Sequence, residues 1–153
     1  MGLDEVEDNG VVGPFLGLDI GEARIGVARA DAATRIAIPA ETVAAGRAER
    51  PAQYIAELVL EHGCRTIVVG WPLTLEGREG RAVQKVQRFM DKLMIAIAQA
   101  GIDAPEVIHW DERMTTTAAE SFLIGADVSR SRRKKVVDQI AATHILQGYL
   151  DSL

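Results

Sequence analysis

The chain has 153 residues, of which 25% are charged and 48% hydrophobic, as in an ordinary globular domain with one core. Its net charge of -5 excludes a protein that is basic throughout, and no apolar run approaches the roughly 20 residues of a membrane-spanning helix. The single cysteine, Cys64, cannot form an internal disulfide, so we expect a soluble, cytoplasmic protein.

An acidic leader opens the chain. Residues 1–14 carry four of the 22 acidic residues and no basic one, which is the opposite of a secretory signal. We expect these residues to be flexible and residues 15–153 to form a single domain. Without the leader, 18 acidic residues stand against 17 basic ones, so the body of the protein is nearly neutral.

Three strands are predicted in the first third of the chain, over residues 15–20, 25–28 and 34–43, with a tight turn between the first two. Pro39 marks the third strand as an edge strand or as its irregular end. A helix follows, because Pro51 suits a first helical turn and Gly63 suits a helix end.

Helices and strands alternate in the rest of the sequence. The predicted elements are a buried strand over residues 66–69, a Gly-rich loop over 70–80, a long helix over 83–97, a strand over 107–110, a short helix over 117–125 and a last helix that Ser131 caps. Three strands followed by this alternation predict an α/β fold whose five-stranded mixed sheet is flanked by helices.

Asp19 stands inside the first predicted strand, between Leu18 and Ile20. An ionised carboxylate buried without a partner costs several kcal/mol, on the order of a protein's whole net stability. The residue therefore needs a cation, a hydrogen-bond network or an arginine, and Arg24 across the turn is the nearest such partner.

Two further acidic residues occupy comparable positions. Glu112 follows a strand that ends at Trp110, and sites in α/β sheets form at the carboxyl ends of strands. Asp138 has small, apolar neighbours in the last helix, which places it toward the sheet. Each has a structural alternative: Glu112 can pair with the adjacent arginine or start a helix, and Asp138 can pair with Lys134, four residues earlier.

Three carboxylates on three elements at one sheet edge indicate a metal site. Mg²⁺ and Mn²⁺ prefer oxygen ligands, and two such ions about 3.5 to 4 Å apart support the in-line hydrolysis of a phosphodiester. The sequence also contains a basic segment, with five cations in residues 129–135, which is either a patch for a phosphate backbone or the solvated start of a helix.

Four segments together resemble the YqgF family of Holliday-junction-resolvase-like proteins and pre-16S ribosomal RNA nucleases. They are residues 16–21 with 24–28, residues 67–73 with Gly77, residues 111–116, and residues 137–142 with Ile145 and Leu146. The segments follow the family order and span the chain from about Phe15 onward. The resemblance implies a ribonuclease-H-like fold and a catalytic, metal-binding triad of Asp19, Glu112 and Asp138.

The resemblance further implies a nuclease that matures the 5′ end of pre-16S ribosomal RNA, with cleavage of four-way DNA junctions as the alternative. Where the family commonly has Asn-x-Asp-Gly, this chain has Thr74 to Gly77. Where resolvases of this fold bring a further carboxylate or histidine, it has Ala141 or Ala142. The second difference favours RNA cleavage over junction cleavage.

Our mechanistic hypothesis is that Asp19 bridges two Mg²⁺ or Mn²⁺ ions and that Glu112 and Asp138 each complete one side. The residues expected to contact nucleic acid are Arg113, Thr115, Arg132, Arg133, Lys134 and Lys135, together with Trp71 by stacking on a base. Thr115 has an alternative role as a helix-start residue, and Trp71 as a packing residue in its loop.

Two other functions compete with this one. The turn after Asp19 also resembles the first phosphate loop of actin-like and sugar-kinase ATPases, but that class needs two such domains and the chain is long enough for one. A non-catalytic nucleic-acid-binding protein would use the basic segment without needing the three acids. Monomer and homodimer both remain open.

Overall fold

The computed structural model describes residues 12–46, 50–114 and 130–153. The elements are β1 (Phe15–Ile20), β2 (Arg24–Ala30), β3 (Ile38–Ala44), α1 (Pro51–His62), β4 (Thr66–Trp71), α2 (Arg81–Gln99), β5 (Glu106–Asp111), the 3-10 turn η3 (Glu112–Met114) and α4 (Arg130–Asp151). The short helix predicted over residues 117–125 and the predicted contact residue Thr115 lie outside the described residues.

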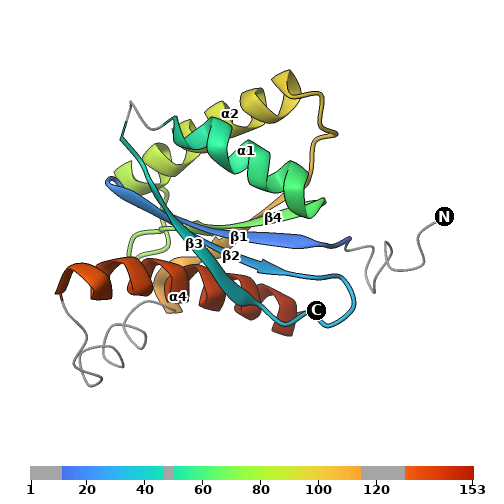
Figure 1. The fold of residues 1–153 in the computed structure, drawn as a ribbon. Coiled ribbons are helices and arrows are strands. Elements are labelled where there is room, and N and C mark those ends of the chain that lie inside the picture. The colour runs from blue at the N-terminus through green and yellow to red at the C-terminus, as the bar shows by residue number, and fades with distance from the viewer. Residues whose placement is uncertain (1–11, 47–49, 115–129) are drawn as a thin grey trace.

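The five strands form one mixed sheet in the order β3-β2-β1-β4-β5. The pairs β1–β2 and β2–β3 are antiparallel, whereas β1–β4 and β4–β5 are parallel. Helices α1 and α2 cover one face of the sheet and α4 covers the other (Figure 1). The predicted α/β fold with a five-stranded mixed sheet flanked by helices is confirmed.

Two predicted boundaries are wrong for local reasons. The third strand begins at Ile38 and not near residue 34, because the Asp31 carboxylate accepts hydrogen bonds from the backbone N–H and the hydroxyl of Thr34 and so forms a turn. The strand β4 continues through Trp71, two residues beyond the predicted end, because β5 still pairs with it there.

The leader predicted over residues 1–14 is not free throughout. The carbonyl of Val12 accepts a hydrogen bond from the Thr66 hydroxyl, and the carbonyl of Pro14 accepts one from the backbone N–H of Arg65. Residues 12–14 therefore belong to the edge of the fold beside the start of β4. Residues 1–11 lie outside the described part of the chain.

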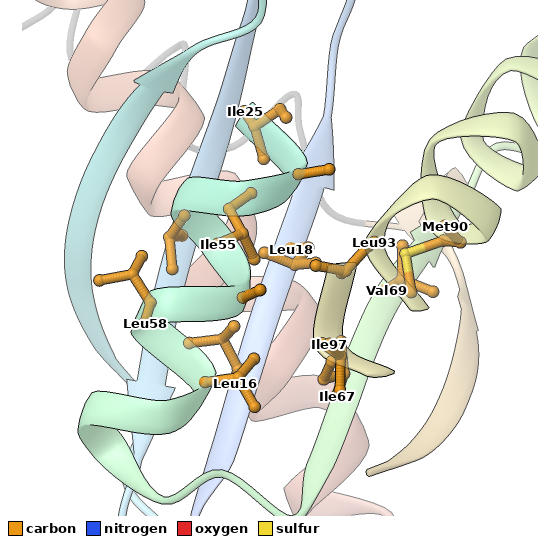
Figure 2. Packing of buried hydrophobic residues seen from close by; sticks show 14 of the residues in the cluster. Leu16, Leu18, Ile25, Ile55, Leu58, Ile67, Val69, Met90, Leu93 and Ile97 are labelled. Carbon is orange, nitrogen blue, oxygen red and sulfur yellow. The ribbon is translucent and has the colours of Figure 1, made fainter. Parts of the chain in front are cut away.

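The sheet separates two hydrophobic cores. The larger core lies between the sheet and α1 and α2, where Leu16 and Leu18 of β1 meet Ile55 of α1 and Leu93 of α2 (Figure 2). The smaller core, under α4, joins residues such as Ala28 and Val68 to the buried side of that helix. In the described part of the chain, no helix is both long enough and apolar enough to cross a membrane.

Glycines let α4 approach the sheet closely. A Cβ on Gly17 of β1 would lie 2.8 Å from the Cβ of Leu146, and a Cβ on Gly26 of β2 would overlap the carbonyl oxygen of Asp138. Both distances are shorter than real carbon contacts, so the backbone of α4 rests almost directly on the strands. This close approach brings Asp138 near the surface of the sheet.

We predict that Gly26→Ala destabilises the protein by about 3 kcal/mol, because the added methyl group meets rigid helix backbone and α4 must shift. Gly80→Ala is the matched control: its Cβ would meet only the Thr74 methyl group, at 3.3 Å, and the loss should be about 1 kcal/mol or less. The measurement is the free energy of unfolding from urea titration. Equal losses for the two variants would contradict the close-packing argument.

Candidate functional site

Asp19 lies near the end of β1, on the face of the sheet that α4 covers. It pairs with Gly26 of β2, and one residue beyond the Leu18–Val69 pair its neighbour on β4 is Gly70. Neither neighbour has a side chain, so groups from other elements can approach the strands on both sides of Asp19. The residue is half-buried, which explains why the strand can hold an acid at this position.

Glu112 reaches the same place from the end of β5. Its Oε1 atom lies 2.6 Å from where a Cβ on Gly70 would stand, so the carboxyl group occupies the space that this glycine leaves open. Burial, a hydrogen bond with Asp19 and the negative charges of Asp19 and Asp111 together raise the pKa of Glu112 to about 9. Because its pKa is raised, Glu112 retains a proton more readily than an ordinary carboxyl group, and that proton can form a hydrogen bond with Asp19.

Asp138, on α4, is the third member of what we call the acidic group, which consists of Asp19, Glu112 and Asp138. Its Oδ2 atom accepts a hydrogen bond from the Nε atom of Arg24 at 2.6 Å, and its side chain is 18% exposed. Burial raises the pKa of Asp138, and the negative charge of Asp19 acts in the same direction, whereas the hydrogen bond and the charge of Arg24 lower it. The cation beside Asp138 is thus Arg24, and not Lys134 as one prediction had it.

The donor chemistry fits a hard divalent cation. Such a cation would displace the proton that the raised pKa of Glu112 favours, and all the donors are oxygens. Among residues 12–46, 50–114 and 130–153, however, no three histidine, cysteine or acidic side chains stand close enough together to hold a metal as they are. Asp138 would have to share its carboxylate between Arg24 and the cation.

Arg113, next to Glu112, already forms hydrogen bonds with other residues of the protein. Its guanidinium donates to the Asp111 carboxylate at 2.6 to 3.0 Å and to the carbonyl of Leu75 at 3.3 Å. The hydrogen bonds from Arg113 lower the pKa of Asp111. The residue predicted to contact a phosphate therefore ties the end of β5 to the loop after β4.

The structure does not support base stacking by Trp71. The residue ends β4 and is 6% exposed, instead of standing in a loop. The imidazole of His109 covers one face of its indole ring, with centroids 3.6 Å apart and planes 5° from parallel. The indole N–H donates to Glu79 at 3.1 Å. In this arrangement Trp71 packs between strand and loop and has no face available for a base.

The predicted basic segment forms the first turns of α4. Arg132, Lys134 and Lys135 are exposed, whereas the side chains of Arg133 and Ser131 lie outside what the structure describes. The carbonyl of Lys135 accepts a hydrogen bond from the hydroxyl of Thr42, which attaches this part of the helix to β3. The exposed cations thus stand on the helix that carries Asp138.

Two features near the site were absent from the sequence predictions. One is the Arg24–Asp138 ion pair, which joins residues 114 positions apart and leaves no local signal. The other is a groove of about 720 Å³ whose lining includes Glu112 and four basic residues of α2. Its signal is present in the sequence as cations at positions 81, 85, 88 and 92, all on one face of a helix.

A mixed sheet in this order, with carboxylates at the ends of β1 and β5 and on the covering helix, defines the ribonuclease-H-like class. RuvC from Thermus thermophilus shares the fold with a TM-score of 0.51, over 92% of this chain and 95% of its own, at 14% identity. A Fowlpox virus resolvase, solved with Holliday junction DNA, gives 0.54 over 92% and 98%, at 11% identity.

The sequence comparison is more specific. Residues 13–152 match the family described as "RuvX: Holliday junction resolvase". A protein of Chloroflexus aggregans named "Putative pre-16S rRNA nuclease" is 46% identical over 138 residues, which cover 90% of this chain and 93% of that protein. The chain belongs to the RuvX Holliday junction resolvase family, and the resemblance inferred from its four motifs is confirmed.

We predict that Glu112→Gln changes how stability depends on pH. The folded pKa of about 9 lies above the ordinary value of 4.5, so the folded state holds this proton more tightly than the unfolded chain. In the wild type, the free energy of unfolding should therefore be greatest below about pH 4.5 and fall as the pH rises toward 9. The fall should be on the order of a few kcal/mol, since one pKa unit corresponds to about 1.4 kcal/mol.

The variant has no proton to lose at this position, so its profile should be flatter over the same range. Urea unfolding in a chelating buffer between pH 5 and 9 measures both profiles. Parallel profiles would mean that Glu112 does not hold the shared proton.

Proposed function

We propose that this protein is a divalent-cation-dependent endonuclease that processes the 5′ end of pre-16S ribosomal RNA. The observation that carries the proposal is the contact between Asp19 and Glu112 at the carboxyl edge of the sheet, with Asp138 beside them. Nucleases and resolvases of this fold generally depend on divalent cations. The curated relatives with 40–46% identity carry the pre-16S rRNA nuclease name, which supports the choice of substrate.

Asp19, Glu112 and Asp138 would hold the cations, Mg²⁺ or Mn²⁺, and we propose two of them. Such cations supply charge neutralisation for the phosphate and a lower pKa for a bound water. Asp19 occupies the central position of the three, because its charge acts on both other carboxyl groups. Burial of Glu112 and Asp138 disfavours their charged forms, which strengthens the preference of the group for a cation.

Arg24 acts as a positioning residue for Asp138. Its guanidinium comes from the start of β2 and fixes one carboxylate oxygen of the helix residue from the sheet side. This leaves the other oxygen, Oδ1, as the donor available to a cation. Arg113 would position the loop after β4 in the same way, through the carbonyl of Leu75.

A second candidate function is the cleavage of four-way DNA junctions, which the description of the matching family favours. The structure weighs against it at one position. Ala141 and Ala142, one turn beyond Asp138, are both completely buried, so that turn of α4 packs on the sheet and adds no fourth carboxylate or histidine to the group. RNA remains our first choice, and it places the reaction in the cytoplasm with a monomer or homodimer as the working form.

We predict that Asp138→Asn lowers the rate of RNA cleavage by on the order of 100-fold or more, because losing even an outer partner of a metal site costs about 10- to 100-fold. Asp151→Asn is the matched control, since Asp151 stands exposed on the same helix, away from the acidic group. The assay follows a labelled pre-16S RNA fragment and a labelled four-way DNA junction on gels, with Mn²⁺ and with chelator.

Manganese-dependent cutting of the RNA by the wild type and by Asp151→Asn, but not by Asp138→Asn, supports the proposal. Preferential cutting of the junction would replace RNA by branched DNA as the substrate. Equal cutting by Asp138→Asn and the wild type would show that the acidic group is not responsible.

A further inference from the structure

A second positive surface lies on the opposite face of the sheet from α4. It borders the groove of about 720 Å³ between α2 and the β1–β2 hairpin, whose walls include Ile25, Pro72 and Phe89. Glu112, a member of the acidic group, also lines this groove. The groove is therefore continuous with the proposed active site.

Four cations follow the groove along α2. Arg81, Lys85, Arg88 and Lys92 all contribute to its lining, and all four are exposed. Their spacing of four, three and four residues keeps them on one side of the helix. At a rise of about 1.5 Å per residue, the row extends about 16 Å from the start of α2. We call these four residues the α2 basic row.

The row keeps most of its charge uncompensated. Lys85 forms an ion pair with Glu22, the one acidic residue of the groove lining besides Glu112. Within the described part of the chain, Arg81, Arg88 and Lys92 form no ion pair with another residue. In addition, the first turn of α2 has no acidic residue. A chain with a net charge of -5 thus concentrates free cations beside its acidic group.

We propose that the α2 basic row binds the phosphate backbone of the RNA substrate on one side of the cut. This inference rests on the proposed nuclease function and names a substrate-binding surface for it. A regular row of guanidinium and ammonium groups suits a regular row of phosphates, and guanidinium groups bind phosphate oxygens in pairs. A second copy of the chain is the wrong occupant, because a symmetric contact here would bring the same four cations together.

The two positive surfaces would then contact the RNA on opposite sides of the cut. Helix α2, which carries the α2 basic row, lies on one face of the sheet, and α4, which carries the other exposed cations, lies on the other face (Figure 1). The acidic group stands at the sheet edge, with Glu112 adjoining the groove and Asp138 on α4. An RNA strand that crosses this edge would contact cations before and after the scissile phosphate, which positions the strand without selecting its bases.

The test compares the wild type with the triple variant Arg81→Ala, Arg88→Ala and Lys92→Ala. Alanine preserves the helix, and the three side chains are exposed, so folding is not at risk. The readout is the anisotropy of a fluorescein-labelled single-stranded pre-16S RNA fragment in chelating buffer, over a series of salt concentrations. We expect the affinity at 0.1 M salt to fall about 100-fold and the slope of log K against log salt to become shallower by about 2.

Two controls isolate the row. Gln84→Ala with Gln87→Ala changes exposed residues of the same helix without changing charge. Arg29→Ala removes one exposed cation at the far end of β2 from the groove residue Ile25. Both should bind RNA with the wild-type salt slope. Binding of a four-way DNA junction is measured in parallel, and weaker junction binding with unchanged RNA binding would overturn the assignment to RNA.

Failure of the inference and failure of the proposed function look different. If the wild type cuts RNA while the triple variant keeps the wild-type affinity and slope, the inference is overturned and the nuclease stands. If the wild type binds RNA without cutting it, the nuclease is wrong, and the comparison of slopes still decides the role of the row. A wild type that does not bind RNA would overturn both.

Discussion

The position of the acidic group depends on two glycines, which have no side chain. Gly26 and Gly70 flank Asp19 on the two neighbouring strands, and a Cβ at either position would stand where Asp138 backbone or the Glu112 carboxyl group now lies. Because the core is close-packed, the two glycines are what allow a helix residue and a residue after β5 to approach the same strand position. The chemistry of the site therefore begins as a packing constraint on the α4 face of the sheet.

Electrostatic balance follows from that packing. Asp19 repels both Glu112 and Asp138, and the protein relieves this repulsion with a proton that the raised pKa of Glu112 favours and with one cation, Arg24, on Asp138. In the proposed function, a divalent ion would replace both forms of relief by binding the same oxygens. The positive surfaces on α2 and α4 stand on either side of this negative centre, so attraction for a phosphate backbone and for a cation are kept apart in space.

The sequence predicts the fold class and the acidic residues of the site. It does not predict contacts that depend on tertiary packing. Asp19 was visible because an acid inside an apolar strand is costly, and Glu112 because it follows a strand. The partnership of Arg24 with Asp138 depends on tertiary packing across 114 residues, which no local pattern encodes. The sequence predicts a loop at Trp71 because Gly70 and Pro72 are typical turn residues, whereas pairing with β5 extends the strand through Trp71. The apolar spacing of α2 predicts only which side of the helix is buried, so it does not indicate a function for the α2 basic row on the exposed side.

The order of the three acids along the chain has a consequence for biosynthesis. Because a chain emerges from the ribosome with its N-terminal part first, Asp19 and Glu112 are available before Asp138. Until α4 docks, the glycine-lined face of the sheet has no cover and the acidic group lacks its third member. A growing polypeptide in which α4 has not yet packed therefore lacks the Asp138 carboxylate, one of the three cation ligands that we propose for cleavage.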